Sequence, residues 1–345
     1  MQQRSKTRPK KEDIDLLSST RSVHAVRHYY LSFISHLAQR CRLRQRVIAT
    51  AQVFFRRFYT QSTLAQHDPA LIAVTALLVA AKVEECAINA KAILKQLQPS
   101  PPPTSTTSSS TTVEWPYSVS DILDCEFVVL HGLLFDLIVF HPYRPLVHFL
   151  ASFHSHDRYA DLVQHSWSLV NDSYYSDVVM LYPPYIVALS CLYMAAHMLN
   201  IDYRAWIRAI ATPQQLIADC THQMLQHIDR REQMEKETAA AAVDSGATTE
   251  ATVDVLGCVL DKRLREALER LQEHHQTRRS GKVRAAEQRV EEEKVGEEAG
   301  VDSVDAAMVD AVVILEDERD CVIVDDKHGA VMEETARKKQ KIDGG

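Results

Sequence analysis

A repeat with a spacing of 115 residues constrains the fold of this chain more than any other feature. When 59–81 is shifted by that distance onto 174–196, six positions are identical, and four others are similar in character: Leu71/Ile186, Ile72/Val187, Val74/Leu189 and Thr75/Ser190. The identical pairs are Tyr59/Tyr174, Pro69/Pro184, Ala73/Ala188, Leu77/Leu192, Ala80/Ala195 and Ala81/Ala196. Self-similarity at a fixed spacing is the signature of a repeated structural unit. We therefore expect two similar units in tandem, over 21–140 and 141–236.

Both units carry the periodicity of α-helices. Apolar residues recur at steps of three and four, as on a helix that buries one face. Asp68 followed by Pro69 is a typical helix start, and the helix that they open is apolar on nearly all sides through Glu85. A helix of this kind belongs at the centre of a bundle. A further helical series begins at Val119, and its apolar residues are Ile122, Leu123, Phe127, Leu130 and Leu134. Since no convincing strand is found, the predicted fold class is all-α, as two helical bundles.

Three segments fall outside this pattern. Residues 1–20 are polar and basic, so we expect a disordered arm, and the Pro/Ser/Thr-rich stretch 99–112 predicts a solvated loop within the first unit. Residues 237–345 carry 16 Lys+Arg against 26 Asp+Glu, a net charge of −10, and no aromatic residue follows Trp206. Such a segment cannot bury enough apolar surface to fold on its own. We predict a mostly disordered acidic tail with one amphipathic helix over 255–275.

The motifs of several protein classes are absent. The seven cysteines are scattered and form no CxxC pair, which argues against a disulfide framework or a zinc finger. No GxGxxG, GxxxxGK[ST], HExxH or GxSxG motif occurs, so we expect neither an enzyme nor a cofactor or metal site. The longest apolar run, 70–81, is too short for a bilayer span. A body of near-neutral charge argues against direct nucleic-acid binding.

Six segments resemble the cyclin family, whose plan is two tandem five-helix cyclin boxes. The stretches RLRQRVIATAQVFFRRFY (42–59) and DPALIAVTALLVAAKVEE (68–85) look like the first box. The remaining segments are CEFVVL (125–130), HPYRPL (141–146), VNDSYYSD (170–177) and LYPPYIVALSCLYMAA (181–196). These narrow the resemblance to the cyclin C branch. The chain departs from that branch because the usual aromatic-rich N-terminal helix is not visible in 1–20.

The resemblance implies which residues bind a kinase. Lys82 and Glu126 occupy the motif positions of the lysine and glutamate with which cyclins grip a cyclin-dependent kinase. The alternative is an internal Lys82–Glu126 salt bridge with no outside role. Glu84, Glu85 and Asp177 are further candidates, because carboxylates near a kinase interface can pair with its arginines. Their alternative is a solvated helix end.

The implied function is that of a regulatory subunit of the Mediator kinase module, which acts on transcription by RNA polymerase II in the nucleus. Its expected partners are the kinase and other Mediator subunits. One alternative is another transcriptional cyclin, of the H, K or L type. A second is a TFIIB-like factor, which would use the same fold to bind DNA but would require an upstream zinc ribbon and a basic body.

The tail holds two kinds of short motif. Val312–Leu315 and Val322–Val324, each followed by acidic residues, resemble SUMO-interacting motifs and suggest SUMO as a further partner. The basic run Arg337, Lys338, Lys339 and Lys341 resembles a nuclear import signal.

Overall fold

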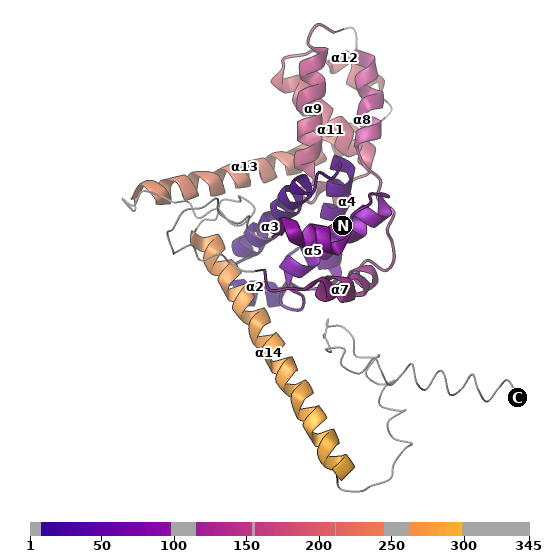
Figure 1. Ribbon diagram of the computed structural model, residues 1–345. Helices are drawn as coiled ribbons and strands as arrows, with labels where there is room; N and C mark the ends of the chain where they lie inside the picture. Colours follow the sequence, from indigo (N-terminus) through magenta and orange to yellow (C-terminus); the bar gives the residue numbers. More distant parts are fainter. Residues whose placement is uncertain (1–7, 98–114, 154–155, 211, 245–261, 299–345) are drawn as a thin grey trace, which may run out of the picture. The chain divides into compact units, whose positions relative to one another are not determined.

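The computed structural model describes residues 8–97, 115–153, 156–210, 212–244 and 262–298, and Figure 1 shows their helices. Within these ranges the chain forms helices and connecting segments and no strand. The helices are α2 (Lys11–Leu17), α3 (Thr20–Arg40), α4 (Gln45–Gln61), α5 (Pro69–Val83), α6 (Ala90–Leu97), α7 (Val119–Gly132), α8 (Tyr143–Leu150), η1 (Ala151–Phe153), α9 (Tyr159–Ser173), α10 (Val178–Leu181), α11 (Pro184–Met198), α12 (Arg204–Ala209), α13 (Gln214–Asp244) and α14 (Lys262–Glu298). The predicted all-α class is confirmed.

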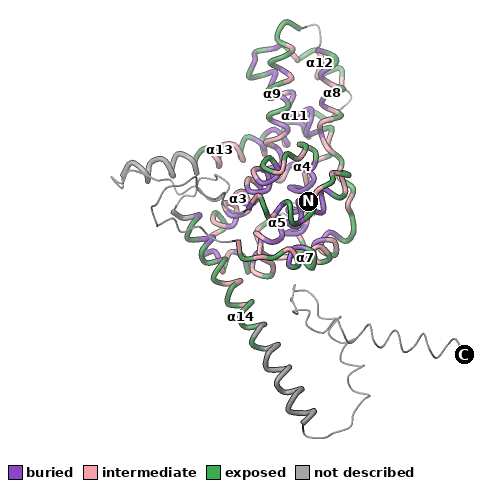
Figure 2. The backbone as a smooth tube through the Cα atoms, in the orientation of Figure 1, coloured by how far each residue is buried: buried purple, intermediate pink, exposed green. Residues whose placement is uncertain are grey.

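The first bundle is built around α5, which contacts α3, α4, α6 and α7. Every residue of α5 from Leu71 to Ala81 is buried, as expected for a helix that is apolar all round (Figure 2). The helix starts where the sequence predicts, because the Asp68 carboxylate accepts a hydrogen bond from the Ala70 N–H at 2.8 Å and Pro69 takes the first turn.

The second bundle repeats this arrangement around α11, which contacts α8, α9 and α13. Like α5, α11 is 15 residues long, and its first residue, Pro184, lies 115 positions after Pro69. Ala188, Ala195 and Ala196 are fully buried, as are their counterparts in α5. The small side chains therefore let neighbouring helices approach closely in both bundles, which is the physical basis of the sequence repeat.

The two bundles share part of their packing. Ala49 and Val53 of α4 belong to the same apolar cluster as the buried residues of α8, α9 and α11. Arg56, also on α4, donates hydrogen bonds to the main-chain carbonyls of Tyr174 and Tyr175 and forms an ion pair with Asp177. Helix α4 thus fastens the first bundle to the end of α9.

The N-terminal segment differs from the prediction of a disordered arm over 1–20. Residues 11–17 form α2, whose Leu17 is buried and whose Asp13 is wholly buried. The Asp13 carboxylate accepts a hydrogen bond from the Leu64 N–H at 2.7 Å and lies 3.6 Å from the Arg27 guanidinium. The buried residues of this helix are one leucine and one paired carboxylate. Because so few apolar residues are involved, the polar composition of the segment did not predict the helix.

Helix α14 packs on the first bundle through one apolar stripe. Its residues Leu264, Ala267, Leu268 and Leu271 are buried. The predicted amphipathic helix over 255–275 is therefore present from Lys262 onward, and it is longer than expected. Residues 255–261 lie outside the described part of the chain.

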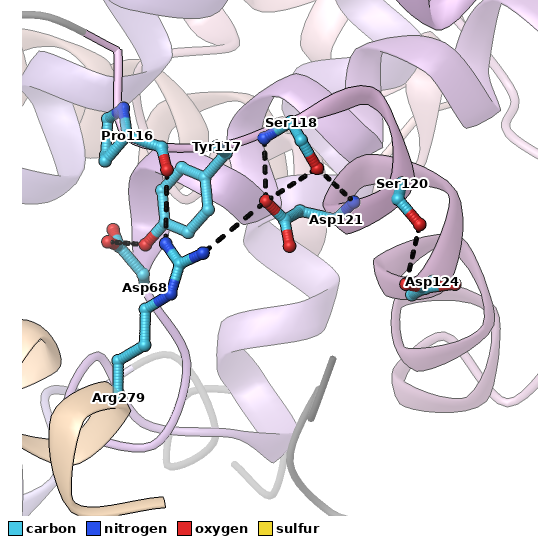
Figure 3. Close-up of polar contacts among 8 residues, drawn as sticks. All are labelled: Asp68, Pro116, Tyr117, Ser118, Ser120, Asp121, Asp124 and Arg279. Atoms are coloured by element: carbon cyan, nitrogen blue, oxygen red, sulfur yellow. Dashed lines mark hydrogen bonds and ion pairs between the residues drawn. The ribbon is translucent and has the colours of Figure 1, made fainter. Parts of the chain in front are cut away.

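Polar contacts follow the apolar stripe of α14. His275 and Arg278 bond the main-chain carbonyls of Leu64 and Ala65, at 2.9 Å each. Figure 3 shows Arg279, which donates to the Pro116 carbonyl at 3.1 Å and lies over the Tyr117 ring. The Tyr117 hydroxyl in turn donates to Asp68, the residue that caps α5. Helix α14 is thereby linked to the start of the central helix.

Several predicted features lie outside the described residues. These are the Pro/Ser/Thr-rich loop at 99–112, the SUMO-interacting motifs, and the basic run Arg337, Lys338, Lys339 and Lys341. Among the helices that are described, none combines the length and the hydropathy that a membrane crossing requires.

Candidate functional site

Lys82 and Glu126 form an ion pair on the surface of the first bundle. The Lys82 Nζ atom lies 2.6 Å from each carboxylate oxygen of Glu126. The Lys82 side chain is 51% exposed and that of Glu126 is 18% exposed. The sequence placed these residues at one site, and the structure brings them together. The two residues pair with each other within the chain. Because their side chains are partly open to solvent, they can still form hydrogen bonds with a partner protein.

The ends of α5 and α7 position this pair. Lys82 lies in the last turn of α5, where a cation interacts favourably with the helix dipole. Helix α7 begins at a capping box, in which the side chains of Ser118 and Asp121 bond each other's main-chain N–H. It ends at Gly132, where a Cβ atom would lie 2.4 Å from the Phe58 ring of α4. Both ends of α7 are therefore fixed, which sets the position of Glu126 between them.

Helix α7 has an apolar face that the described residues leave uncovered. Ile122, Cys125 and Val129 are buried, but Leu123 is 47% exposed and Phe127 is 74% exposed. The sequence pattern showed these residues as one helical series of apolar positions, and the structure divides that series into a buried part and an exposed part. Helical spacing puts Leu123 and Phe127 together on a second stripe, adjacent to Glu126.

The segment that follows α7 extends this apolar surface toward α8. Leu134, Phe135, Ile138 and Phe140 are between 61% and 77% exposed. Arg57 of α4 holds the segment by donating to the main-chain carbonyls of Asp136 and Ile138, at 3.2 Å each. We call this surface the α7–linker face; it comprises Leu123, Phe127, Leu134, Phe135, Ile138 and Phe140. An exposed apolar surface of this kind is typical of a protein–protein interface.

Glu84 is not part of that surface. Its side chain is only 10% exposed, and it lies 2.7 Å from both the Thr50 hydroxyl and the Arg46 Nε. Thr50 also bonds Nε2 of His141 at 3.0 Å, and Nδ1 of His141 lies 2.6 Å from the Tyr174 hydroxyl. The Thr50 proton goes to Glu84, so His141 Nε2 donates to Thr50 and Nδ1 accepts from Tyr174.

This chain of hydrogen bonds joins the two bundles through a neutral imidazole. Burial lowers the pKa of His141 to about 4, although the neighbouring Glu84 carboxylate acts in the opposite direction. The sequence offered Glu84 as a kinase contact or a solvated helix end. The structure instead makes it an internal acceptor at the junction of the bundles.

Glu85 and Asp177 have different surroundings. Glu85 is exposed, has a left-handed backbone with φ of 52°, and makes no ion pair within the described residues. Asp177 is 40% exposed and is paired with Arg56, at a distance of 2.5 Å. Glu85 is therefore open to an outside partner next to Lys82, whereas Asp177 belongs to the junction between α4 and the end of α9.

The residues that the structure describes hold no metal-ion site beside this surface. In the part of the chain that the structure describes, no group of three or more His, Cys, Asp or Glu side chains could hold a metal ion. The chemistry that the surface offers is recognition, by an apolar face with one ion pair at its edge.

Comparisons with known proteins match both halves of the chain to domain families. The family model of the cyclin N-terminal domain matches residues 1–138, and that of a cyclin C-terminal domain matches 141–236. Cyclin-C1-2 of Arabidopsis thaliana is 30% identical over 230 residues, which cover 67% of this chain and 87% of the relative. Cyclin-C of Rattus norvegicus is 34% identical over 212 residues, covering 60% and 75%.

Among solved structures, a chain of the CAK complex of Chaetomium thermophilum bound to ATP-gamma-S is similar in fold. Its TM-score is 0.53 at 16% sequence identity, and the match covers 74% of each chain. At that identity the likeness concerns the fold alone.

Proposed function

The chain belongs to the cyclin family, and we propose that it is the regulatory subunit of a cyclin-dependent kinase that docks on the α7–linker face. The observation that carries this proposal is the apolar surface of α7 beside the Lys82–Glu126 pair. An interface commonly has an apolar centre with polar groups at its rim. In this arrangement Phe127 supplies the centre, and Lys82 and Glu126 are charged groups beside it that the docked kinase buries.

The proposed mechanism is allosteric activation. A kinase transfers phosphate only when the lysine of its third strand and the glutamate of helix αC are paired. A partner that binds only the inward position of αC shifts the kinase population toward the active state. A body with two fixed bundles suits this role, because a surface that is already formed loses little entropy on binding.

We further propose that the kinase is that of the Mediator complex, and that the protein acts in the nucleus on transcription by RNA polymerase II. The support is the sequence similarity to proteins named Cyclin-C, together with the segments HPYRPL and VNDSYYSD. The other Mediator subunits are the remaining proposed partners. The proposals of SUMO binding and of nuclear import rest on sequence motifs of the tail alone.

The test is affinity purification of the tagged full chain from its own cells, with mass spectrometry of the proteins recovered. We expect a cyclin-dependent kinase together with Mediator subunits. Glu126→Ala should weaken kinase binding by about 2–5 kcal/mol, the range for truncating one partner of a buried interfacial charge pair. Lys82→Ala should act in the same direction.

The repeat provides a matched control for this experiment. His197 of α11 lies 115 positions after Lys82 and is also exposed, so His197→Ala should leave kinase recovery unchanged. If Glu126→Ala, Lys82→Ala and His197→Ala all recover the same amount of kinase, neither Lys82 nor Glu126 belongs to the interface. DNA retention without any kinase would favour the TFIIB-like alternative.

Phe127→Ala tests the apolar centre of the same face. Because Phe127 is 74% exposed, its truncation should change the free energy of unfolding by less than about 0.5 kcal/mol. Kinase affinity should fall by about 2 kcal/mol or more, as for an aromatic side chain at the centre of an interface. Met198 of the second bundle, 60% exposed, gives the control Met198→Ala. If both variants bind the kinase equally well, the α7–linker face is not the docking surface.

A further inference from the structure

Helix α14 lies beyond the two cyclin domains, yet it reaches the start of the helix that carries Glu126. The matched domains end at residue 236, and α14 begins at Lys262. Its contacts with the first bundle continue to Arg279, and two residues later a Cβ atom at Gly281 would meet nothing within 4 Å. Arg279 therefore lies near the end of the docked part of α14.

The Arg279 guanidinium contacts three residues around the start of α7, as Figure 3 shows. It donates a hydrogen bond to the Pro116 carbonyl at 3.1 Å, and its Cζ atom lies 5.5 Å from the centre of the Tyr117 ring. Its other terminal nitrogen lies 3.8 Å from the Asp121 carboxylate. One side chain thus contacts a main-chain carbonyl, an aromatic ring and a carboxylate, and a planar guanidinium suits all three.

Asp121 links this contact to the helix itself. Its side chain is only 3% exposed, and one carboxylate oxygen accepts hydrogen bonds from the Ser118 N–H at 2.7 Å and from the Ser118 hydroxyl at 3.0 Å. A buried carboxylate is costly unless it is hydrogen-bonded and paired with a cation. Arg279 supplies that cation, so the capping box of α7 is completed by a residue of another helix.

The same guanidinium lies over a ring that is tied to the start of α5. The Tyr117 hydroxyl donates to Asp68, whose carboxylate caps α5. The N-terminal ends of α5 and α7 are therefore joined through Tyr117, and Arg279 holds that ring from α14. Further along, these two helices carry Lys82 and Glu126.

We infer that Arg279 is a positioning residue for kinase binding, which acts by fixing the first turn of α7. Glu126 lies five residues after Asp121, or about 7.5 Å along the axis at the usual rise of an α-helix. Over so short a distance a helix moves as a rigid element, so a shift of its first turn also displaces Glu126 and Phe127. This role concerns the α7–linker face and therefore rests on the proposed function.

The first test measures the affinity of the purified full chain for the kinase recovered in the affinity purification above. Arg279→Gln should weaken binding by at least about fivefold, the lower end of the usual coupling between two sites. Arg279→Lys should retain most of the affinity, because an ammonium group can still pair with Asp121. Arg284→Gln is the matched control, since Arg284 is an exposed arginine of the same helix beyond Gly281. Equal affinity of the Arg279→Gln and Arg284→Gln variants would overturn the inference.

A second measurement does not involve the kinase. Hydrogen exchange of the free full chain reports how often α7 opens, with α9 of the second bundle as the internal reference. Arg279→Gln should raise exchange in the first half of α7 by at least about threefold and leave α9 unchanged, whereas a general loss of stability would raise both. Unchanged exchange in α7, or an equal rise in the two helices, would contradict a local positioning role.

Phe127→Ala distinguishes a failure of this role from a failure of the proposed function. If Phe127→Ala binds the kinase as tightly as the wild type, the α7–linker face is not the docking surface, and the role of Arg279 fails with it. If Phe127→Ala loses affinity while Arg279→Gln keeps it, the docking surface stands and only the role of Arg279 is overturned. The expected result is a loss of affinity in both variants.

Discussion

Helices α5 and α11 occupy the same place in the two bundles, yet they differ at their C-terminal ends. Both end in the same backbone motif: the Cys86 N–H bonds the Ala81 carbonyl at 2.8 Å, and the Ile201 N–H bonds the Ala196 carbonyl at 2.9 Å. Side chains at this end differ between the bundles. Lys82 and Glu84 of the first bundle correspond to His197 and Leu199 of the second.

That difference shows how a duplicated fold can acquire one functional face. The backbone and the buried alanines are shared, because packing around a central helix requires them in both bundles. The turn that follows the helix carries no such requirement. In the first bundle it holds an ion pair and an internal acceptor, and in the second it holds an exposed imidazole and a buried leucine.

The largest effect should come from the shared core. Leu77 and Leu192 are equivalent positions with at most 1% exposure. Leu77→Ala and Leu192→Ala should each lower the free energy of unfolding by about 2–5 kcal/mol, through lost burial and a remaining cavity. Urea denaturation of the two variants measures this. A loss below about 1 kcal/mol at one site would mean that the two central helices are not packed alike.

Acid should weaken the side-chain contact of Tyr174 more than that of Tyr59, its counterpart in the first bundle. The Tyr59 hydroxyl donates to the main-chain carbonyl of His67, whereas that of Tyr174 bonds the imidazole of His141. The pKa of His141 is lowered from 6.5 to about 4 by burial. Since the unfolded chain then binds more protons between these values, stability is retained above pH 6.5 and decreases as the pH falls toward 4.

For a shift of this size the loss attributable to His141 is about 3 kcal/mol across that window. His141→Gln should remove this part of the pH dependence while other groups continue to titrate. The comparison is the pH profile of the unfolding free energy for the wild type and the variant. Parallel profiles would show that His141 is not the titrating group.

Glu84 should matter for stability where its neighbour Glu85 does not. Glu84→Ala removes the acceptor of the Thr50 hydroxyl and the partner of Arg46, so we expect a loss of about 2 kcal/mol in unfolding free energy. Glu85→Ala is the control, because that side chain is exposed. Thermal and urea unfolding of both variants measure the difference. Similar stability of the two would contradict the internal role of Glu84.

The smallest effect concerns the left-handed residue after each helix, Glu85 with φ of 52° and Asn200 with φ of 54°. Glycine adopts this conformation without strain, so Glu85→Gly should stabilise the fold by about 0.5 kcal/mol. Asn200→Gly should gain less, because asparagine tolerates the left-handed region better than glutamate. Denaturant midpoints measured side by side detect this difference, and the opposite order would argue against matching caps.

Much of the fold could be predicted from residues that start helices or fill the centre of a helical bundle. Asp68 and Pro69 predicted the start of α5, and the shift of 115 residues predicted the position of α11. The family resemblance put Lys82 and Glu126 at one kinase-binding site, and the structure brings the two side chains together. The structure of polar segments was harder to predict. Helix α2 is held by Leu17 and the buried Asp13, and composition does not reveal such contacts.

The sequence by itself determined the helices, their duplication and the central position of α5 and α11, since periodicity and capping are local properties of the chain. Only the tertiary structure decided which apolar stripe of α7 is covered, where Glu84 is buried, and that Arg279 of α14 reaches the start of α7. The reason is physical. Periodicity tells which side chains share a face of a helix, but burial and charge balance depend on the neighbours that the folded chain brings to that face.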